Sequence, residues 1–134
     1  MDVYAYIDVS QKQKYIYKNN KLIDNLYNSF IIKAVTEELD QEQEKFVKEL
    51  LEKDQNLHIE QHIDIISLKR YLNENFQELH SIVYSGGGNS IVRFENSKAA
   101  IEFVEGYSFE VLKAYPDLEL YISLIDEEKD DIQF

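Results

Sequence analysis

Three of the four glycines in the chain stand next to one another, at Gly86, Gly87 and Gly88. Runs rich in β-branched and aromatic residues flank them, at 81–84 and 90–94. Glycine has no Cβ and therefore adopts the positive φ angles that tight hairpin turns require. The pattern predicts two antiparallel strands joined at a glycine tip, and any fold for this chain has to accommodate that hairpin.

Strands and helices are predicted ahead of the hairpin as well. Residues 3–9 form a mostly apolar run, which predicts a central strand buried on both faces. From Tyr15 to near Leu39, apolar residues recur every three or four positions, which predicts one or two helices with a break at 18–20. Residues 40–80 are harder to assign, and we expect them to form a mostly helical insertion before the hairpin.

After the hairpin the chain continues into one more helix and one more strand. Asn96 or the following serine is predicted to cap the helix, and Pro116 to stop it. A last strand is predicted at 118–124. The order strand, helix, strand, strand, helix, strand is that of the α+β ferredoxin-like βαββαβ fold. We expect a single domain over 1–125 and a solvated acidic tail at 126–134.

The predicted topology brings a carboxylate close to the glycine tip. Asp8 lies near the carboxyl end of the first strand, which is where open α/β sheets place their ligands. In the ferredoxin-like fold this strand lies beside the hairpin. Asp8 and the glycine tip are therefore predicted to face the same ligand.

The charge of the chain restricts its partners. A formal net charge of −12 argues against wrapping a nucleic acid, because such binding depends on clustered Lys and Arg. Residues 9–36 differ, with five lysines and one acid, which favours either a solvated helix face or an anion site near the hairpin. The sequence has no long apolar run, no basic leader and no cysteine, so we expect a cytoplasmic protein without membrane contact.

The residues around Asp8 and the hairpin are similar to one family of nucleotide-joining domains. The matching positions are Asp8, Gln11 or Gln13, Tyr15-Ile16-Tyr17, Lys21-Leu22, Ser29 and Tyr84-Ser85-Gly86-Gly87. This series resembles the palm of the type III CRISPR large subunit, which typically reads Asp, Gln-x-Tyr-Ile-Phe, Asn-Lys-Leu and a small-small-Ser triplet. It is similar also to nucleotide cyclases and GGDEF diguanylate cyclases. The matching blocks and the element order cover residues 2–36 and 81–124.

The hairpin departs from the family's pattern at its acids. In active palms, carboxylates of the first strand and the hairpin hold two metal ions, which activate a ribose hydroxyl and neutralise the triphosphate. Here Gly88 and Asn89 stand where the acids would be, and Tyr27-Asn28 replaces two small residues of the first helix. The resemblance therefore implies a palm that has lost two-metal catalysis. Asp8 remains, either as a ligand of a single magnesium ion or as an N-cap for the following helix.

A ligand at this place would meet backbone donors and short polar side chains. The glycine N–H groups can form an anion-binding nest for a phosphate, unless the glycines only supply a turn with positive φ. Lysines of the basic segment can neutralise the phosphate, while hydroxyl and amide groups can bind the ribose or the base. The candidate nucleotide-binding residues are Asp8, Lys14, Lys18, Lys21, Ser29, Ser85, Gly86, Gly87, Gly88, Asn89 and Ser90.

Ten tyrosines are spread along the chain. Five of them fall in predicted core elements, at Tyr4, Tyr6, Tyr84, Tyr107 and Tyr121. We expect most of these to pack in the core and not to serve as platforms for stacked bases.

The leading hypothesis is a catalytically degenerate palm that binds a nucleotide or a cyclic nucleotide, or pairs with an active palm, in CRISPR-like anti-phage signalling. Paired palms in the family share nucleotides across their interface, so the resemblance implies a homodimer or pairing with another palm-containing protein. Two alternatives stay open. One is an active nucleotidyl cyclase or oligonucleotide synthase that uses Asp8 and metal, and the other is a ferredoxin-like interaction module without a ligand.

Overall fold

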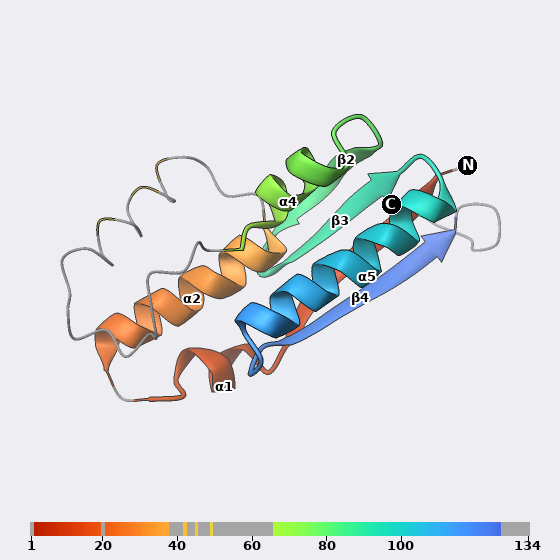
Figure 1. Cartoon of the computed structure of the whole chain (residues 1–134). Helices are drawn as coiled ribbons and strands as arrows, with labels where there is room; N and C mark the ends of the chain where they lie inside the picture. Colours follow the sequence, from red (N-terminus) through yellow and green to blue (C-terminus); the bar gives the residue numbers. More distant parts are fainter. Residues whose placement is uncertain are drawn as a thin grey trace.

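A four-stranded antiparallel sheet with helices packed against it forms the protein, as seen in a computed structural model (Figure 1). The structure describes residues 2–19, 21–37 and 66–126, together with the single positions 42, 45 and 49. The elements, in chain order, are β1 (Val3–Ser10), α1 (Lys12–Ile16), α2 (Leu22–Thr36), α4 (Leu68–Asn75), β2 (His80–Gly86), β3 (Asn89–Phe94), α5 (Ser97–Ala114) and β4 (Glu119–Asp126). This mixed α+β architecture is compatible with the ferredoxin-like fold that the sequence predicts.

The strands lie in the order β2-β3-β1-β4, and neighbouring strands are antiparallel. β1 is a central strand, and it pairs with β3 from Val3 opposite Phe94 to Asp8 opposite Asn89. On its other side β1 pairs with β4 along the whole length of both strands. The predicted neighbourhood of the first strand and the hairpin is therefore confirmed.

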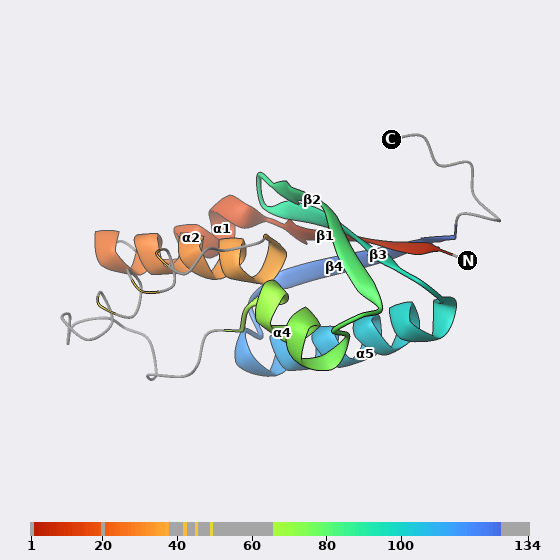
Figure 2. The same ribbon diagram turned by 90° about the horizontal axis from the view of Figure 1, so that it is seen from above.

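The two faces of the sheet differ in how well they are covered. Helices α4 and α5 lie on one side of it (Figure 2). Every second residue of β1 is buried on that side, namely Val3, Ala5, Ile7 and Val9. The prediction that β1 is buried on both faces is wrong, because the residues between these four, Tyr4 and Tyr6 among them, are only half-buried. The tyrosine rings made the whole run look apolar, although only alternate positions contact the core.

The helices begin and end close to where the sequence predicted. The first helical region is broken, since α1 ends at Ile16 and α2 begins at Leu22. α2 then extends beyond the end of the strands in both views (Figures 1 and 2). At the start of α5 the Asn96 side chain accepts a hydrogen bond from the Ala99 N–H at 2.8 Å, which confirms the predicted cap. α5 ends two residues before Pro116.

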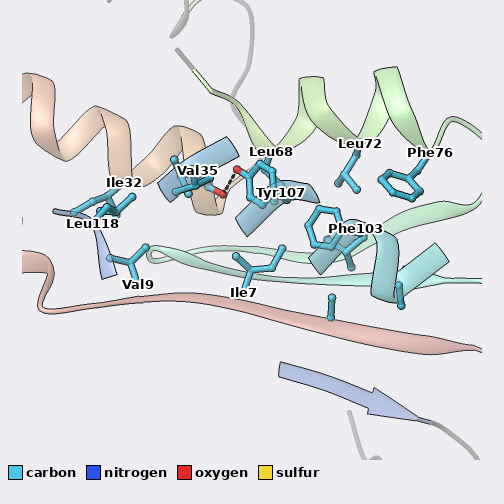
Figure 3. Packing of buried hydrophobic residues seen from close by; sticks show 14 of the residues in the cluster. Ile7, Val9, Ile32, Val35, Leu68, Leu72, Phe76, Phe103, Tyr107 and Leu118 are labelled. Carbon is cyan, nitrogen blue, oxygen red and sulfur yellow. Dashed lines mark hydrogen bonds between the residues drawn. The ribbon is translucent and has the colours of Figure 1, made fainter. Parts of the chain in front are cut away.

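Aliphatic and aromatic side chains pack together between the sheet and the helices, among them the rings of Tyr107, Phe103 and Phe76 (Figure 3). The Phe103 ring stacks on Tyr107 with centroids 5.2 Å apart and meets Phe94 of β3 at 5.1 Å. Tyr107 is fully buried, and its hydroxyl donates to the Val35 carbonyl at 2.7 Å. Because a buried hydroxyl without a partner is costly, this bond holds the last turn of α2 in place against α5.

The predicted insertion and tail are only partly within the described residues. α4 confirms a helix in the insertion, whereas His80, its predicted last residue, begins β2. Residues 40–65 lie outside the described residues except for the three single positions. The tail was predicted to begin at Asp126, which is wrong because Asp126 ends β4 and pairs with Val3. Residues 127–134 lie outside the described part of the chain.

Candidate functional site

The end of β1 and the tip of the hairpin lie side by side at one edge of the sheet. Asp8 is paired with Asn89, and Asn89 is paired across the hairpin with Gly86. Since Ile7 and Val9 on either side of Asp8 are buried under the helices, the Asp8 side chain points to the opposite face. Directly paired residues share a face, so Asn89 lies on the same side as Asp8.

The turn at the tip consists of Gly87 and Gly88. Their φ angles are +67° and +83°, and Gly86 before them has a φ of +156°. Positive φ at both central residues is what a type I′ hairpin turn requires, and it fits the right-handed twist of the flanking strands. The predicted need for glycine at these positions is confirmed by the backbone geometry.

A lysine that the sequence analysis did not single out connects the tip to Asp8. Gln11 adopts a left-handed conformation, with φ 57° and ψ 41°, and turns the chain from β1 into α1. Lys12 comes directly afterwards, and its Nζ lies 3.1 Å from Asp8 Oδ1 and 3.5 Å from the Gly87 carbonyl. The ammonium group therefore bridges the strand carboxylate and the hairpin backbone.

Gly88 is needed for this bridge as well as for the turn. A Cβ on Gly88 would lie 2.8 Å from Cε of Lys12, closer than real Cβ contacts. A Cβ on Gly87 would meet no atom within 4 Å. The two glycines share a positive φ, but only Gly88 leaves room for the lysine.

A glutamate contacts the tip from the other direction. The N–H of Gly88 donates to Oε2 of Glu37 at 3.2 Å, and Glu37 is the first residue after α2. The tip thus binds an ammonium through a carbonyl and a carboxylate through an N–H group. Glu37 is not among the residues predicted for the site, because its contact with Gly88 depends on how α2 packs against the rest of the fold.

The other predicted lysines are placed differently. Lys18 lies 4.4 Å above the centre of the Tyr15 ring, and its Nζ is 3.9 Å from Asp117, which precedes β4. The side chains of Lys14 and Lys21 are exposed. The structure therefore brings Lys12, and not these three lysines, into contact with the hairpin.

The predicted serines also differ in their surroundings. Ser85 and Ser90 are paired across the hairpin. Ser90 is fully buried, and its hydroxyl has no hydrogen-bond partner among the described residues. Ser29 is exposed on α2. Of the three, Ser85 and Ser90 lie in the hairpin next to its tip.

Asp8 does not cap the helix that follows it. The N-cap of α1 is Gln11, which makes no side-chain capping bond. Asp8 Oδ1 accepts hydrogen bonds from the Val9 N–H at 2.9 Å and from Lys12. Over residues 2–19, 21–37 and 66–126, no three histidine or acidic side chains lie together as a metal site would require. Asp8 and the Gly87 carbonyl instead present two oxygens to the Lys12 ammonium.

Burial keeps several tyrosine hydroxyls protonated. It raises the pKa of Tyr27 to about 12, with a smaller contribution from Tyr115. Burial also raises the pKa of Tyr15 and of Tyr107 above the ordinary tyrosine value, again with a contribution from Tyr115. The Tyr107 hydroxyl therefore stays protonated, and able to donate to the Val35 carbonyl, above the pH at which an exposed tyrosine ionises.

Two of the five strand and helix tyrosines are exceptions to the expected packing in the core. Tyr107 is fully buried, but Tyr84 is 53% exposed and Tyr121 is 60% exposed. Tyr4 and Tyr6 are half-buried. The apolar pattern of a strand does not tell whether a second layer covers its other face.

A hollow of about 500 Å³ lies elsewhere, beside α4. Residues of α4, the two residues before it and Glu110 of α5 line it. No residue of the hairpin contributes to its wall, so it is separate from the Asp8 site.

Neither protein-family models nor curated proteins indicate what the site does. No protein-family model matches the sequence, and no curated protein matches it. Among the described helices, none is both long and apolar enough to cross a bilayer.

Proposed function

We propose that this chain is a catalytically degenerate palm-like protein of the cytoplasm, which acts in CRISPR-like anti-phage signalling. It binds a nucleotide or a cyclic nucleotide at the glycine tip, or pairs there with an active palm. The main support is one observation at the tip. The Gly88 N–H donates to the Glu37 carboxylate, and the Lys12 ammonium contacts the neighbouring carbonyl of Gly87. A phosphate oxygen can take the place of the Glu37 carboxylate, because both are anionic acceptors for a backbone donor.

The same geometry supports nucleotide binding without catalysis of phosphoryl transfer. Asn89 places a neutral amide next to Asp8, and the Lys12 ammonium occupies one oxygen of that carboxylate. Two-metal transfer needs several free carboxylates around the reacting phosphate. A partner palm would have to supply them, so pairing with a second palm-containing chain, or with a second copy, belongs to the same proposal.

Calorimetric titration with ATP, GTP and cyclic oligonucleotides tests the binding site. Lys12→Met removes the charge that contacts the hairpin, and Lys14→Met removes an equal charge from an exposed position of the same helix. A charge-assisted hydrogen bond contributes about 1.5–3 kcal/mol, so we expect Lys12→Met to weaken binding at least tenfold. Lys14→Met should change it less than twofold. No heat with any ligand at millimolar concentration, or equal losses in both variants, would contradict a ligand site at the hairpin.

Catalysis is tested separately. The protein is incubated with ATP and Mg²⁺ or Mn²⁺, and the products are separated by chromatography. We expect ATP to be recovered unchanged. A product that disappears in the Asp8→Ala variant would show an active enzyme and overturn the degenerate assignment.

A further inference from the structure

The sheet face opposite α5 carries aromatic side chains right up to the hairpin tip. Across the strands, Asp8 is flanked by Asn89 on one side and Tyr121 on the other. The row below contains Tyr6 next to Ile91, which is paired in turn with Tyr84. Since paired residues share a face, these rings and the Asp8 carboxylate lie on the same surface.

The exposed aromatic area is concentrated at the end of the sheet where the tip lies. Tyr121 and Tyr84 are 60% and 53% exposed, whereas Tyr4 and Tyr6 in the middle of the face are half-buried. The Tyr84 side chain also reaches toward the tip, since a Cβ on Gly86 would lie 3.6 Å from its hydroxyl. Two accessible rings therefore border the place where Lys12 and Asp8 meet the hairpin.

The charges on this face favour a small aromatic ligand over a large polyanion. Asp8 is paired with Lys12, and Asp2 is paired with Arg93, each at 3.1 Å. A chain with a net charge of −12 also repels nucleic acid at long range. At the tip, a phosphate would replace the Glu37 carboxylate on the Gly88 N–H, next to the Lys12 ammonium, and two exposed rings lie beside this place. This arrangement matches a ligand that has an anionic end and a flat, uncharged end.

We infer that the base of the bound nucleotide lies on this open face and stacks on Tyr84 or Tyr121, while its phosphates contact the glycine tip. The inference rests on the proposed function, and it adds the base-binding half of the same site. Every base has a flat π-face, so a tyrosine platform binds purines and pyrimidines with little selection. Specificity for one base would then come from hydrogen bonds, for which the Asn89 amide is adjacent.

Titration calorimetry with two probes separates the base from the phosphates. ATP carries both, and inorganic triphosphate carries the phosphates alone. Stacking contributes about 1–3 kcal/mol per base, so we expect wild-type protein to bind ATP roughly 5- to 150-fold more tightly than triphosphate. The double variant Tyr84→Ala/Tyr121→Ala should lose this difference in affinity and keep its affinity for triphosphate. The double Phe variant should keep the difference, because phenylalanine still stacks.

Tyr17→Ala is the matched control, since Tyr17 is 65% exposed but follows α1 and lies outside the sheet. Equal affinity of wild-type protein for ATP and triphosphate would refute the stacking inference and leave the phosphate site standing. An ATP affinity that is unchanged in the double Ala variant would also refute the stacking inference. If neither probe binds, the proposed function fails and the inference fails with it. A dimer in sedimentation experiments that the double Ala variant dissociates, without loss of ATP affinity, would assign the face to a second copy of the chain.

Discussion

The geometry at the tip predicts that two adjacent glycines respond differently to the same substitution. Gly87 and Gly88 both have positive φ, so alanine introduces backbone strain at either position. At Gly88 the new Cβ also meets the end of the Lys12 side chain, whereas at Gly87 it enters open space. Gly87→Ala is thus the control for the strain, and the difference between the variants reports the contact with the lysine.

The two contributions can be estimated from the structure. A left-handed L-residue costs about 1–2 kcal/mol, and the loss of unfolded-state entropy that accompanies Gly→Ala offsets roughly half of this, so Gly87→Ala should destabilise by about 1 kcal/mol. In Gly88→Ala the flexible lysine moves away and gives up its bond to Asp8. Both side chains of that ion pair are about one-third exposed, at 34% and 35%. Such a pair contributes roughly 0.5 kcal/mol, so Gly88→Ala should cost about 1.5 kcal/mol.

Urea unfolding of a double-mutant cycle measures this difference. In the Lys12→Ala background the clash is gone, and Gly88→Ala should cost no more than Gly87→Ala does. The expected coupling between Gly88 and Lys12 is about 0.5 kcal/mol, and the coupling between Gly87 and Lys12 should be near zero. Equal costs for the two glycine variants in the wild-type background, or fully additive effects of Gly88→Ala and Lys12→Ala, would refute the contact between the lysine and the tip.

Three further predictions concern the fold. Tyr107→Phe removes the donor to the buried Val35 carbonyl and should lower the free energy of unfolding by about 1–2 kcal/mol in urea titrations, and an unchanged value would mean that the bond contributes nothing. The pKa of Tyr27 is about 12 in the folded protein against an ordinary value of 10.0. Because folding favours the neutral hydroxyl, its contribution to the free energy of unfolding is complete below pH 10.0 and is lost as the pH rises through 12. Tyrosinate absorbance and circular dichroism should therefore change together in that pH range. In the Tyr27→Phe variant the change in circular dichroism should occur at a higher pH. Asn96→Ala should cost α5 about 1 kcal/mol in thermal unfolding, while Asn96→Asp, which also caps, should cost little.

The hairpin and α5 could be predicted because their signals are local. The glycine triplet requires positive φ wherever it lies, and Asn96 satisfies the N–H of Ala99 within its own helix. The break between α1 and α2 is likewise a property of a short polar stretch. These elements in order were enough to predict the ferredoxin-like plan and the position of the first strand beside the hairpin, since few topologies fit them.

The contacts at the tip could not be predicted in the same way. Lys12 follows Asp8 by four positions, but it contacts Asp8 because Gln11 takes a left-handed conformation, which glutamine seldom adopts. Glu37 reaches Gly88 only through the packing of α2, which is set by side chains far along the chain. The exposed tyrosines were misjudged for a related reason, since periodicity reports which side chains share a face and not what covers it.

The pairing of β1 with β4 has a consequence for how the chain is made. Val3 is paired with Asp126, so the first and last strands of the sheet are neighbours. During translation β1 leaves the ribosome long before β3 and β4 are made. Until then β1 has no partner strands and its apolar face stays exposed. A chain that stops after α5 would leave one side of β1 as an open edge, able to pair with another molecule. We therefore expect truncation before Glu119 to cause aggregation, and not merely a less stable monomer.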